Sequence, residues 1–491
     1  MNFDPLREWI DSFLTAAEEE RYQIELAARR EPALGALYSA SADLFSVAKI
    51  TEVQRVLAGS AGMEERRLRS ILEFLARGRA LVVAASALDE RLEWEVFGTV
   101  PIDESRIPHR QILGALRLAA DPDRRHAIEE AHLRTLAEQS YVAEDFLTRQ
   151  REGIAELGYR SQVEAYQILG GIDLRATLRD GERFLQETND FYFDLLRWYL
   201  PRATGVEPGQ ATEADGARME AAPEFDSLLP GGEQNRRIPA LIAESGISPD
   251  AEGRISIEWE AYLGGSTGAL CRTPEVPGRI LLAVGARSGR APLAFFLRAY
   301  GIALHHGYTD PELPVEQRRL GDDSVPRASG GLFESLLWTP AFLTRVYDLP
   351  RTRLPDLLRV SALCTLLAVR RDVARLAYEL AYYEGSGAPD TYTDLLTEAT
   401  GLRHDPRRAV WSVEPEFDSA RRIRAAQLAA IHATTLRNRF DEDWFRNPRA
   451  GGYLRDLFSH GRRYSAPELA VQLVSQRLGF EPLLEEMRRL V

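Results

Sequence analysis

The chain has 491 residues, of which 45% are hydrophobic and 27% charged, and its formal net charge is −13. This length and composition are those of an ordinary globular protein with a large core, arranged as one helical body or as two lobes. The excess of acidic residues argues against a general nucleic-acid surface, which requires clustered basic groups. Arginine supplies nearly all of the positive charge, because Lys49 is the only lysine.

The cysteine count and the length of the apolar runs indicate the cellular compartment of the protein. Cys271 and Cys364 are the only cysteines, too few for a disulfide framework. The residues after Met1 show no basic segment ahead of an apolar run, as a signal peptide would. The longest apolar stretch, residues 80–88, is far shorter than a membrane-spanning helix. We therefore expect a cytoplasmic protein that binds neither membranes nor nucleic acids.

Apolar residues recur at helical spacing through the first part of the chain, with charged residues between them. The sequence Asp121-Pro122-Asp123 is typical of a helix start, since an aspartate can cap the first turn and a proline fits within it. Amphipathic helices are therefore predicted over residues 5–30, 40–57, 63–95, 108–158 and 174–200.

The composition changes between residues 201 and 252, where prolines and glycines are frequent and regular structure should be short. Two strands are predicted next, an alternating one at 254–259 and an apolar one at 279–284. The glycine-rich segment 264–271 between them lacks the Gly-Lys-Ser/Thr of a phosphate-binding loop, which favours a turn beside a sheet edge. A loop to about 328 separates two groups of predicted helices, the first over 291–306 and the others over 331–348, 353–385, 390–402, 415–440 and 441–460, with two short ones to the end.

Five stretches in the second half of the chain resemble segments of the M3 oligopeptidases and M2-like zinc peptidases, in the order that the family has. Residues 300–306 resemble the second half of the zinc-binding helix, and Gly331 to Ser335 resemble the next helix, which supplies a glutamate ligand. The others are 268–277, similar to a strand-edge segment before the zinc helix, 370–380 and 437–454. The resemblance covers most of the chain. It implies a mainly α-helical, two-lobed fold with a deep central channel and a small β-sheet beside the former zinc helix.

The residues that carry the chemistry of that family are missing. Its zinc helix reads His-Glu-x-x-His, in which two histidines hold the metal and the glutamate activates water. The resemblance puts Arg298, Ala299 and Ile302 at these positions, and an arginine has no free lone pair for a metal. Glu334 alone remains of the ligand set, and the stretch similar to the family's transition-state tyrosines has Arg422 and no tyrosine. These departures favour a lost zinc site, no cofactor and no ordinary peptidase activity.

Position 298 faces inward in the family, and a buried guanidinium needs a partner. We hypothesise that Arg298 pairs with Glu334 where the metal would sit; the alternatives are another acidic partner and a solvated side chain. His305 and His306 are adjacent, so they point to different faces of a helix. A relocated metal site from His305, Glu334 and Cys271 is a further alternative, because these ligand types suit zinc. Structural histidines and a buried cysteine are the simpler interpretation.

The resemblance implies an N-terminal helical lobe over 1–200, a linker with the small β region over 201–290 and a C-terminal helical lobe over 291–491, in a single composite unit. Our functional hypothesis is an inactive M3-like homologue that binds a peptide or protein partner in or around the channel. A regulatory subunit of an active relative and a hydrolase with a relocated metal site are the alternatives. The sheet edge between about 254 and 284 could bind a peptide by strand addition. The candidate channel residues are Tyr300, His305, His306, Cys271, Arg298, Glu334 and Arg422, of which His305 and Glu334 are also the metal candidates.

Overall fold

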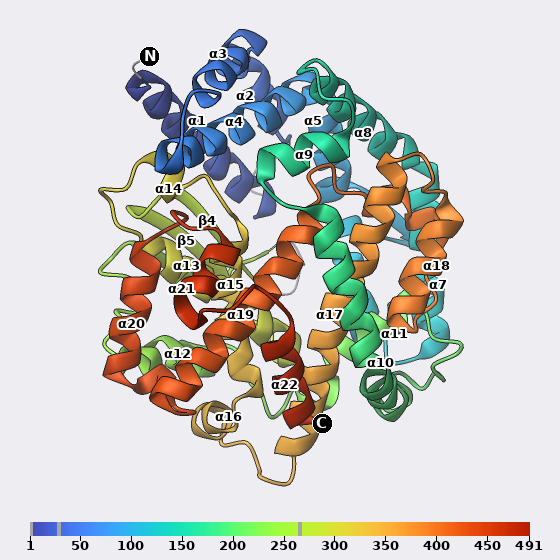
Figure 1. Cartoon of the computed structure of the whole chain (residues 1–491). Helices are drawn as coiled ribbons and strands as arrows, with labels where there is room; N and C mark the ends of the chain where they lie inside the picture. The colour runs from blue at the N-terminus through green and yellow to red at the C-terminus, as the bar shows by residue number, and fades with distance from the viewer. Residues whose placement is uncertain (1–2, 27–30, 264–267) are drawn as a thin grey trace.

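The computed structural model describes residues 3–26, 31–263 and 268–491, and it consists mainly of helices around a small sheet (Figure 1). The predicted helix start at Asp121 is present, since the Asp121 carboxylate accepts a hydrogen bond from the backbone N–H of Arg124 at 3.2 Å. The first half of the chain forms α1 (Asp4–Glu25), α2 (Leu34–Ala40), α3 (Val47–Leu57), α4 (Gly62–Val83), α5 (Ala85–Phe97), α6 (Ile112–Leu118), α7 (Pro122–Glu138), α8 (Ser140–Ala155), α9 (Gln162–Gly170) and α10 (Leu174–Thr204).

A short hairpin interrupts these helices and was not predicted. Strands β1 (Thr99–Ile102) and β2 (Ser105–Pro108) pair antiparallel, with Val100 opposite Ile107. Asp103 has a φ of 55° in the turn between them. Each strand has only four residues, which is too short for alternation to stand out from the helical pattern on either side.

The middle of the chain contains two further helices and the main sheet. Helices α11 (Glu213–Ala221) and α12 (Glu233–Ala243) precede β3 (Ile255–Trp259), β4 (Ala269–Glu275) and β5 (Arg279–Val284). The strand order is β3-β5-β4, with β3 parallel and β4 antiparallel to β5. Strand β4 is therefore an edge strand. Residues 264–267 of the predicted glycine-rich turn lie outside the described residues.

Helices make up the rest of the chain (Figure 1). The predicted helix over 331–348 is wrong in its limits, because α15 begins at Ser324 and Pro340 starts a separate helix. The elements are α13 (Arg290–Gly307), α14 (Val315–Arg318), α15 (Ser324–Glu334), α16 (Pro340–Tyr347), α17 (Leu354–Tyr383), α18 (Pro389–Thr400), α19 (Asp418–Phe440), α20 (Pro448–Ser459), α21 (Ala466–Val474) and α22 (Glu481–Leu490).

Glycines allow α15 to lie very close to α13. A Cβ added to Gly301 of α13 would lie 2.5 Å from the Ser329 carbonyl oxygen, and one added to Gly330 of α15 would lie 2.8 Å from the Arg298 carbonyl oxygen. Larger residues would force the two helices apart. This close crossing brings the side chains at positions 298 and 334 together.

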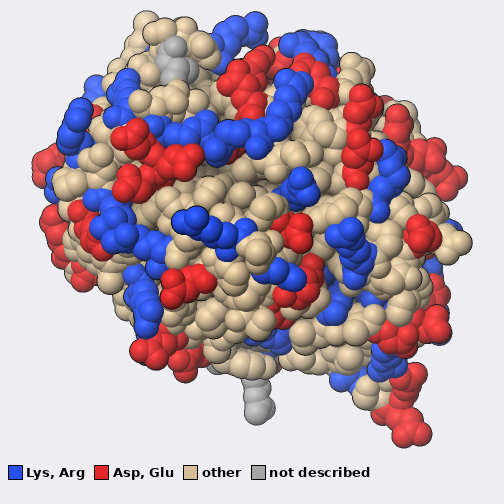
Figure 2. All heavy atoms as spheres, turned by 90° about the horizontal axis from the view of Figure 1, so that it is seen from below, with Lys and Arg blue, Asp and Glu red and all other residues tan. Residues whose placement is uncertain are grey.

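One large apolar core includes side chains from α1 through to α22. Basic and acidic side chains are mixed over the face seen from below, with basic groups gathered across its middle (Figure 2). Within the part of the chain that the structure describes, no helix is both long and apolar enough to cross a bilayer.

Candidate functional site

The predicted pairing of Arg298 with Glu334 is present at the crossing of α13 and α15. The Nε atom of Arg298 donates to Oε2 of Glu334 at 2.8 Å, and Nη2 lies 2.6 Å from the same oxygen. The negative charge of Glu334 raises the pKa of Arg298, and the more distant Asp372 and Glu220 act in the same direction. The contact is thus a charge-assisted ion pair between two fixed helices.

The pair lies against solvent rather than in dry protein, which corrects the expectation of a buried guanidinium. The Arg298 side chain is 48% exposed and that of Glu334 18%. Phe295, Arg298 and Ile302 are accessible at helical spacing on α13, whereas the residues between them are buried. The guanidinium is partly exposed although surrounding protein still desolvates it. We infer that this face of α13 borders a recess between the helices that solvent can enter, which we call the hollow.

Charged side chains continue along this hollow from Asp372 of α17. Nε of Arg422, on α19, donates to Asp372 at 2.8 Å, and its Nη1 donates to Asp418 at 2.8 Å. Asp418 also accepts from Arg327 of α15 at 2.7 Å, and Arg327 bonds Asp323 at 2.5 Å. We call these five residues together with Arg298 and Glu334 the ionic row. Its members come from α13, α15, α17 and α19 and from Asp323 next to α15, so they are distant in sequence.

The row ends at a cavity of about 240 Å³ between the N-terminal helices α1 and α4 and the C-terminal helices α15 and α19. Arg421 of α19 bonds Glu73 of α4 at 2.5 Å across it, and Arg77 of α4 pairs with Glu416. Such contacts hold the two ends of the chain together around a polar space. The cavity can accommodate a small polar group or several water molecules.

The other predicted site residues occupy different surroundings. Tyr300 is fully buried, and its hydroxyl donates to the Pro249 carbonyl at 3.0 Å. Nδ1 of His305 lies 3.0 Å from the Ser329 hydroxyl, and burial with the nearby Arg462 lowers the pKa of His305 to about 3. His306 lines the cavity, and burial holds its pKa well below the usual value.

Cys271 lies on the edge strand β4. Its thiol is half-buried, and desolvation raises the pKa to about 12, which keeps it protonated at neutral pH. The outer edge of β4 is partly covered: Thr15 of α1 donates to the Pro274 carbonyl at 2.8 Å, and Arg319 donates to the Thr273 carbonyl at 3.1 Å.

The donor atoms do not fit a zinc ion. No histidine in the sequence is followed by glutamate. Across residues 3–26, 31–263 and 268–491, no group of three His, Cys, Asp or Glu side chains is arranged to hold a metal, so His305, Glu334 and Cys271 do not form one. Glu334, the one acid that the resemblance retains, already binds a guanidinium.

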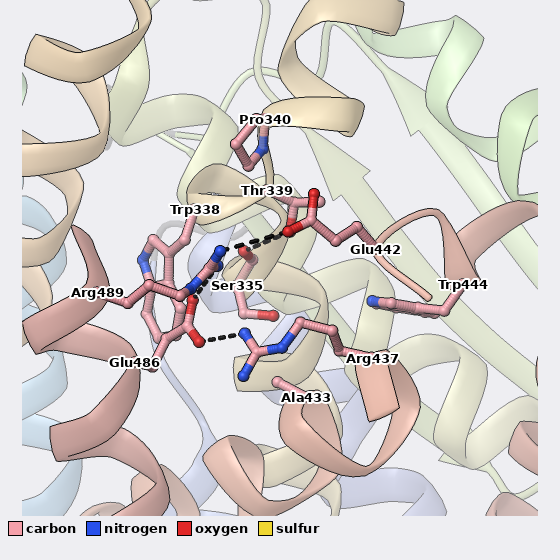
Figure 3. A pocket seen from close by; sticks show the side chains of 10 residues that line it. All are labelled: Ser335, Trp338, Thr339, Pro340, Ala433, Arg437, Glu442, Trp444, Glu486 and Arg489. Atoms are coloured by element: carbon pink, nitrogen blue, oxygen red, sulfur yellow. Dashed lines mark hydrogen bonds and ion pairs between the residues drawn. The ribbon is translucent and has the colours of Figure 1, made fainter. Parts of the chain in front are cut away.

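A separate small pocket of about 30 Å³ lies under the C-terminal helix (Figure 3). Glu486 of α22 pairs with Arg437 of α19 and accepts from Arg489 at 2.7 Å, and Arg489 reaches Glu442 at 3.3 Å. This volume holds about one water molecule. These ion pairs attach α22 to the body, and the space beside them is too small for a ligand larger than water.

Sequence reasoning missed most of the ionic row. Asp372 follows Arg370 and Arg371 within an otherwise apolar stretch of α17, and Asp323 precedes α15 beside Asp322. Charged residues on a helix that is buried on every side are the signal that could have found them, because buried charges need partners.

A long helix packed on a three-stranded sheet inside a mainly helical body is an arrangement that this chain shares with several solved peptidase structures. A protein from Bacillus anthracis described as an oligoendopeptidase F superposes with a TM-score of 0.64 and 13% identity, over 98% of this chain and 83% of that one. PZ peptidase A with an inhibitor gives a TM-score of 0.63 and 14% identity, over 96% and 85%. An M32 carboxypeptidase from Deinococcus radiodurans gives 0.59 and 13%, over 99% and 97%. No protein-family model and no curated protein matches the sequence. The chain therefore has the fold of these peptidases.

Proposed function

We propose that this chain is a peptidase-fold protein that binds a peptide or a peptide segment of a partner along the ionic row and does not hydrolyse it through zinc. The observation that supports this most is the Arg298–Glu334 pair at the crossing of α13 and α15. A guanidinium carries its positive charge at every physiological pH and needs no cofactor. The Arg298 guanidinium neutralises the charge of Glu334, but it supplies neither a Lewis acid nor an activated water.

The chemistry of the row suits a polar, extended ligand. Carboxylates and guanidinium groups alternate from Glu334 to Asp323, so a peptide can exchange ion pairs with the wall as it enters. Residues 269–272 of β4 can supply backbone hydrogen bonds to the same peptide. Each exchanged ion pair contributes little net affinity, so binding should be of modest strength and sensitive to salt.

Binding of fluorescein-labelled octapeptides of acidic, basic and neutral composition, followed by fluorescence polarisation, tests the proposal. Arg422→Gln removes the arginine that bridges Asp372 and Asp418. We expect it to weaken the best peptide by about fivefold to tenfold, which corresponds to about 1–1.4 kcal/mol. Arg488→Gln, an exposed residue of α22, removes the same charge and should leave affinity unchanged. Equal effects of both variants would contradict binding along the row.

A second experiment returns the family's residues to α13. The triple change Arg298→His, Ala299→Glu and Ile302→His keeps Glu334 as a further ligand beside the new histidines. If the hollow still has the shape of a metallopeptidase site, this variant should bind zinc in equilibrium dialysis. If the triple variant binds no zinc, the groups that surround and orient the ligands must have changed as well.

A further inference from the structure

A further pocket, away from the ionic row, carries arginines that form no ion pair among the described residues. It has a volume of about 500 Å³, within the range of small-molecule sites. Its walls are the C-terminal end of α10, the 3-10 turn Pro223–Phe225 after α11, and the beginning of α17. None of the residues that line it belongs to the ionic row.

Arg202, Arg218 and Arg353 line this pocket. Within the part of the chain that the structure describes, none of the three forms an ion pair, whereas most of the arginines in the ionic row and the cavity beside it do. The Nε atoms of Arg218 and Arg353 are buried and have no hydrogen-bond partner there. A buried, unpaired N–H of a guanidinium costs free energy unless something binds it.

The structure holds these three side chains in place without an acidic partner. Arg202 stacks over Trp198 at 5.0 Å from the ring centre, and Arg353 over Phe225 at 5.3 Å. Arg218 donates through Nη1 to the Arg117 carbonyl at 2.7 Å. Stacking fixes the planes of the Arg202 and Arg353 guanidinium groups, and the hydrogen bond fixes Arg218, so little conformational entropy remains to be lost on binding.

Two carboxylates also line the pocket, and among the described residues neither forms an ion pair with these arginines. Glu224 accepts a hydrogen bond from the Tyr199 hydroxyl at 2.5 Å. Asp356 lies in the first turn of α17, a helix of 30 residues whose positive end faces this region. Three arginines and the positive end of a helix therefore line a pocket that has only two acidic side chains. This local excess of positive charge contrasts with the net charge of −13 for the whole chain.

We propose that this pocket binds a phosphate group, either of a free inorganic phosphate or of a small phosphate ester. A guanidinium presents paired N–H donors that match two phosphate oxygens, and Arg202, Arg218 and Arg353 each bring one guanidinium to the wall of this pocket. The start of α17 adds the positive end of its dipole. The site is independent of the proposed peptide binding, since it shares no residue with the ionic row.

Isothermal titration calorimetry with inorganic pyrophosphate tests the assignment. The unmodified chain should bind it, and Arg202→Gln and Arg353→Gln should each raise the Kd by about tenfold, the loss of one charged hydrogen bond. Arg351→Gln is the matched control, because Arg351 is exposed two residues before Arg353 and does not line the pocket. It should change the Kd by less than about twofold, as for an exposed charge. Circular dichroism melts verify that each variant folds.

The source of the phosphate follows from a second titration with adenosine diphosphate. Tighter binding than pyrophosphate assigns the pocket to a phosphate ester, and equal or weaker binding to free phosphates. The proposal is overturned if the unmodified chain takes up no pyrophosphate at millimolar concentration, or if Arg351→Gln weakens binding as much as Arg353→Gln does.

Discussion

Two ion pairs of equal length in this protein should differ strongly in their contribution to stability. Arg298 Nη2 lies 2.6 Å from Glu334 Oε2, and Arg125 Nη2 lies 2.6 Å from Asp215 Oδ1. The side chains of the first pair are 48% and 18% exposed, and those of the second are both 0% exposed. Glu334→Gln and Asp215→Asn each remove one carboxylate charge and keep the shape of the side chain.

The magnitudes follow from solvation. After Glu334→Gln, water in the hollow solvates the Arg298 guanidinium, so the loss should be about 0–1 kcal/mol of unfolding free energy. After Asp215→Asn, Arg125 keeps its bonds to the carbonyls of Ala119 and Thr204 but no counter-charge. A buried charge that has lost its partner costs about 3–5 kcal/mol.

Urea unfolding followed by far-ultraviolet circular dichroism at pH 7 measures both values with one protocol. A loss above about 3 kcal/mol for Glu334→Gln would refute the reasoning, because it would mean that Arg298 lies in dry protein. A small loss for both variants would instead contradict the burial of the Arg125–Asp215 pair. The small loss expected for Glu334→Gln matters most for function, since a solvated Arg298–Glu334 pair can open to bind a ligand.

Three further predictions concern single groups. Burial lowers the pKa of His305 to about 3, so between that pH and about 6.5 the unfolded chain binds the extra proton, and stability falls as the pH decreases through this window. His305→Gln should reduce the slope of unfolding free energy against pH by up to about 1.4 kcal/mol per unit, in urea titrations from pH 7 to 4. Glu486→Gln should cost about 1–3 kcal/mol and speed amide exchange in α22, whereas Glu485→Gln at an exposed position should change neither. Desolvation raises the thiol pKa of the half-buried Cys271 to about 12 and that of the buried Cys364 to about 11, so neither should react with iodoacetamide at pH 7.5 until the chain is unfolded; rapid labelling of the folded protein would contradict these raised pKa values.

Long amphipathic helices were predictable because their apolar periodicity extends over many turns. The predicted helices 174–200 and 353–385 correspond to α10 and α17. The limits of shorter elements were not predictable in the same way. Apolar spacing alone joined 108–158 into one segment; the start of α7 at Pro122 was predicted from Asp121-Pro122, but the junction at Gln139, after which α8 begins, was not. A proline or a single cap residue decides such borders locally, and periodicity is insensitive to it.

The centre of the site was predictable and its extent was not. Arg298 and Glu334 could be paired from sequence because the resemblance assigned both positions to one metal site. Asp372, Asp418 and Asp323 could not, because each becomes part of the row only through the packing of α15, α17 and α19. The exposure of Arg298 was also hidden, since sequence cannot distinguish an internal hollow from a dry core.

The zinc content of the purified, unmodified protein tests the central claim most directly. Inductively coupled plasma mass spectrometry on protein prepared without chelators should find far less than one zinc per chain, since a guanidinium occupies the carboxylate that a metal would use. One zinc per chain, with peptide cleavage that a chelator abolishes, would contradict the account.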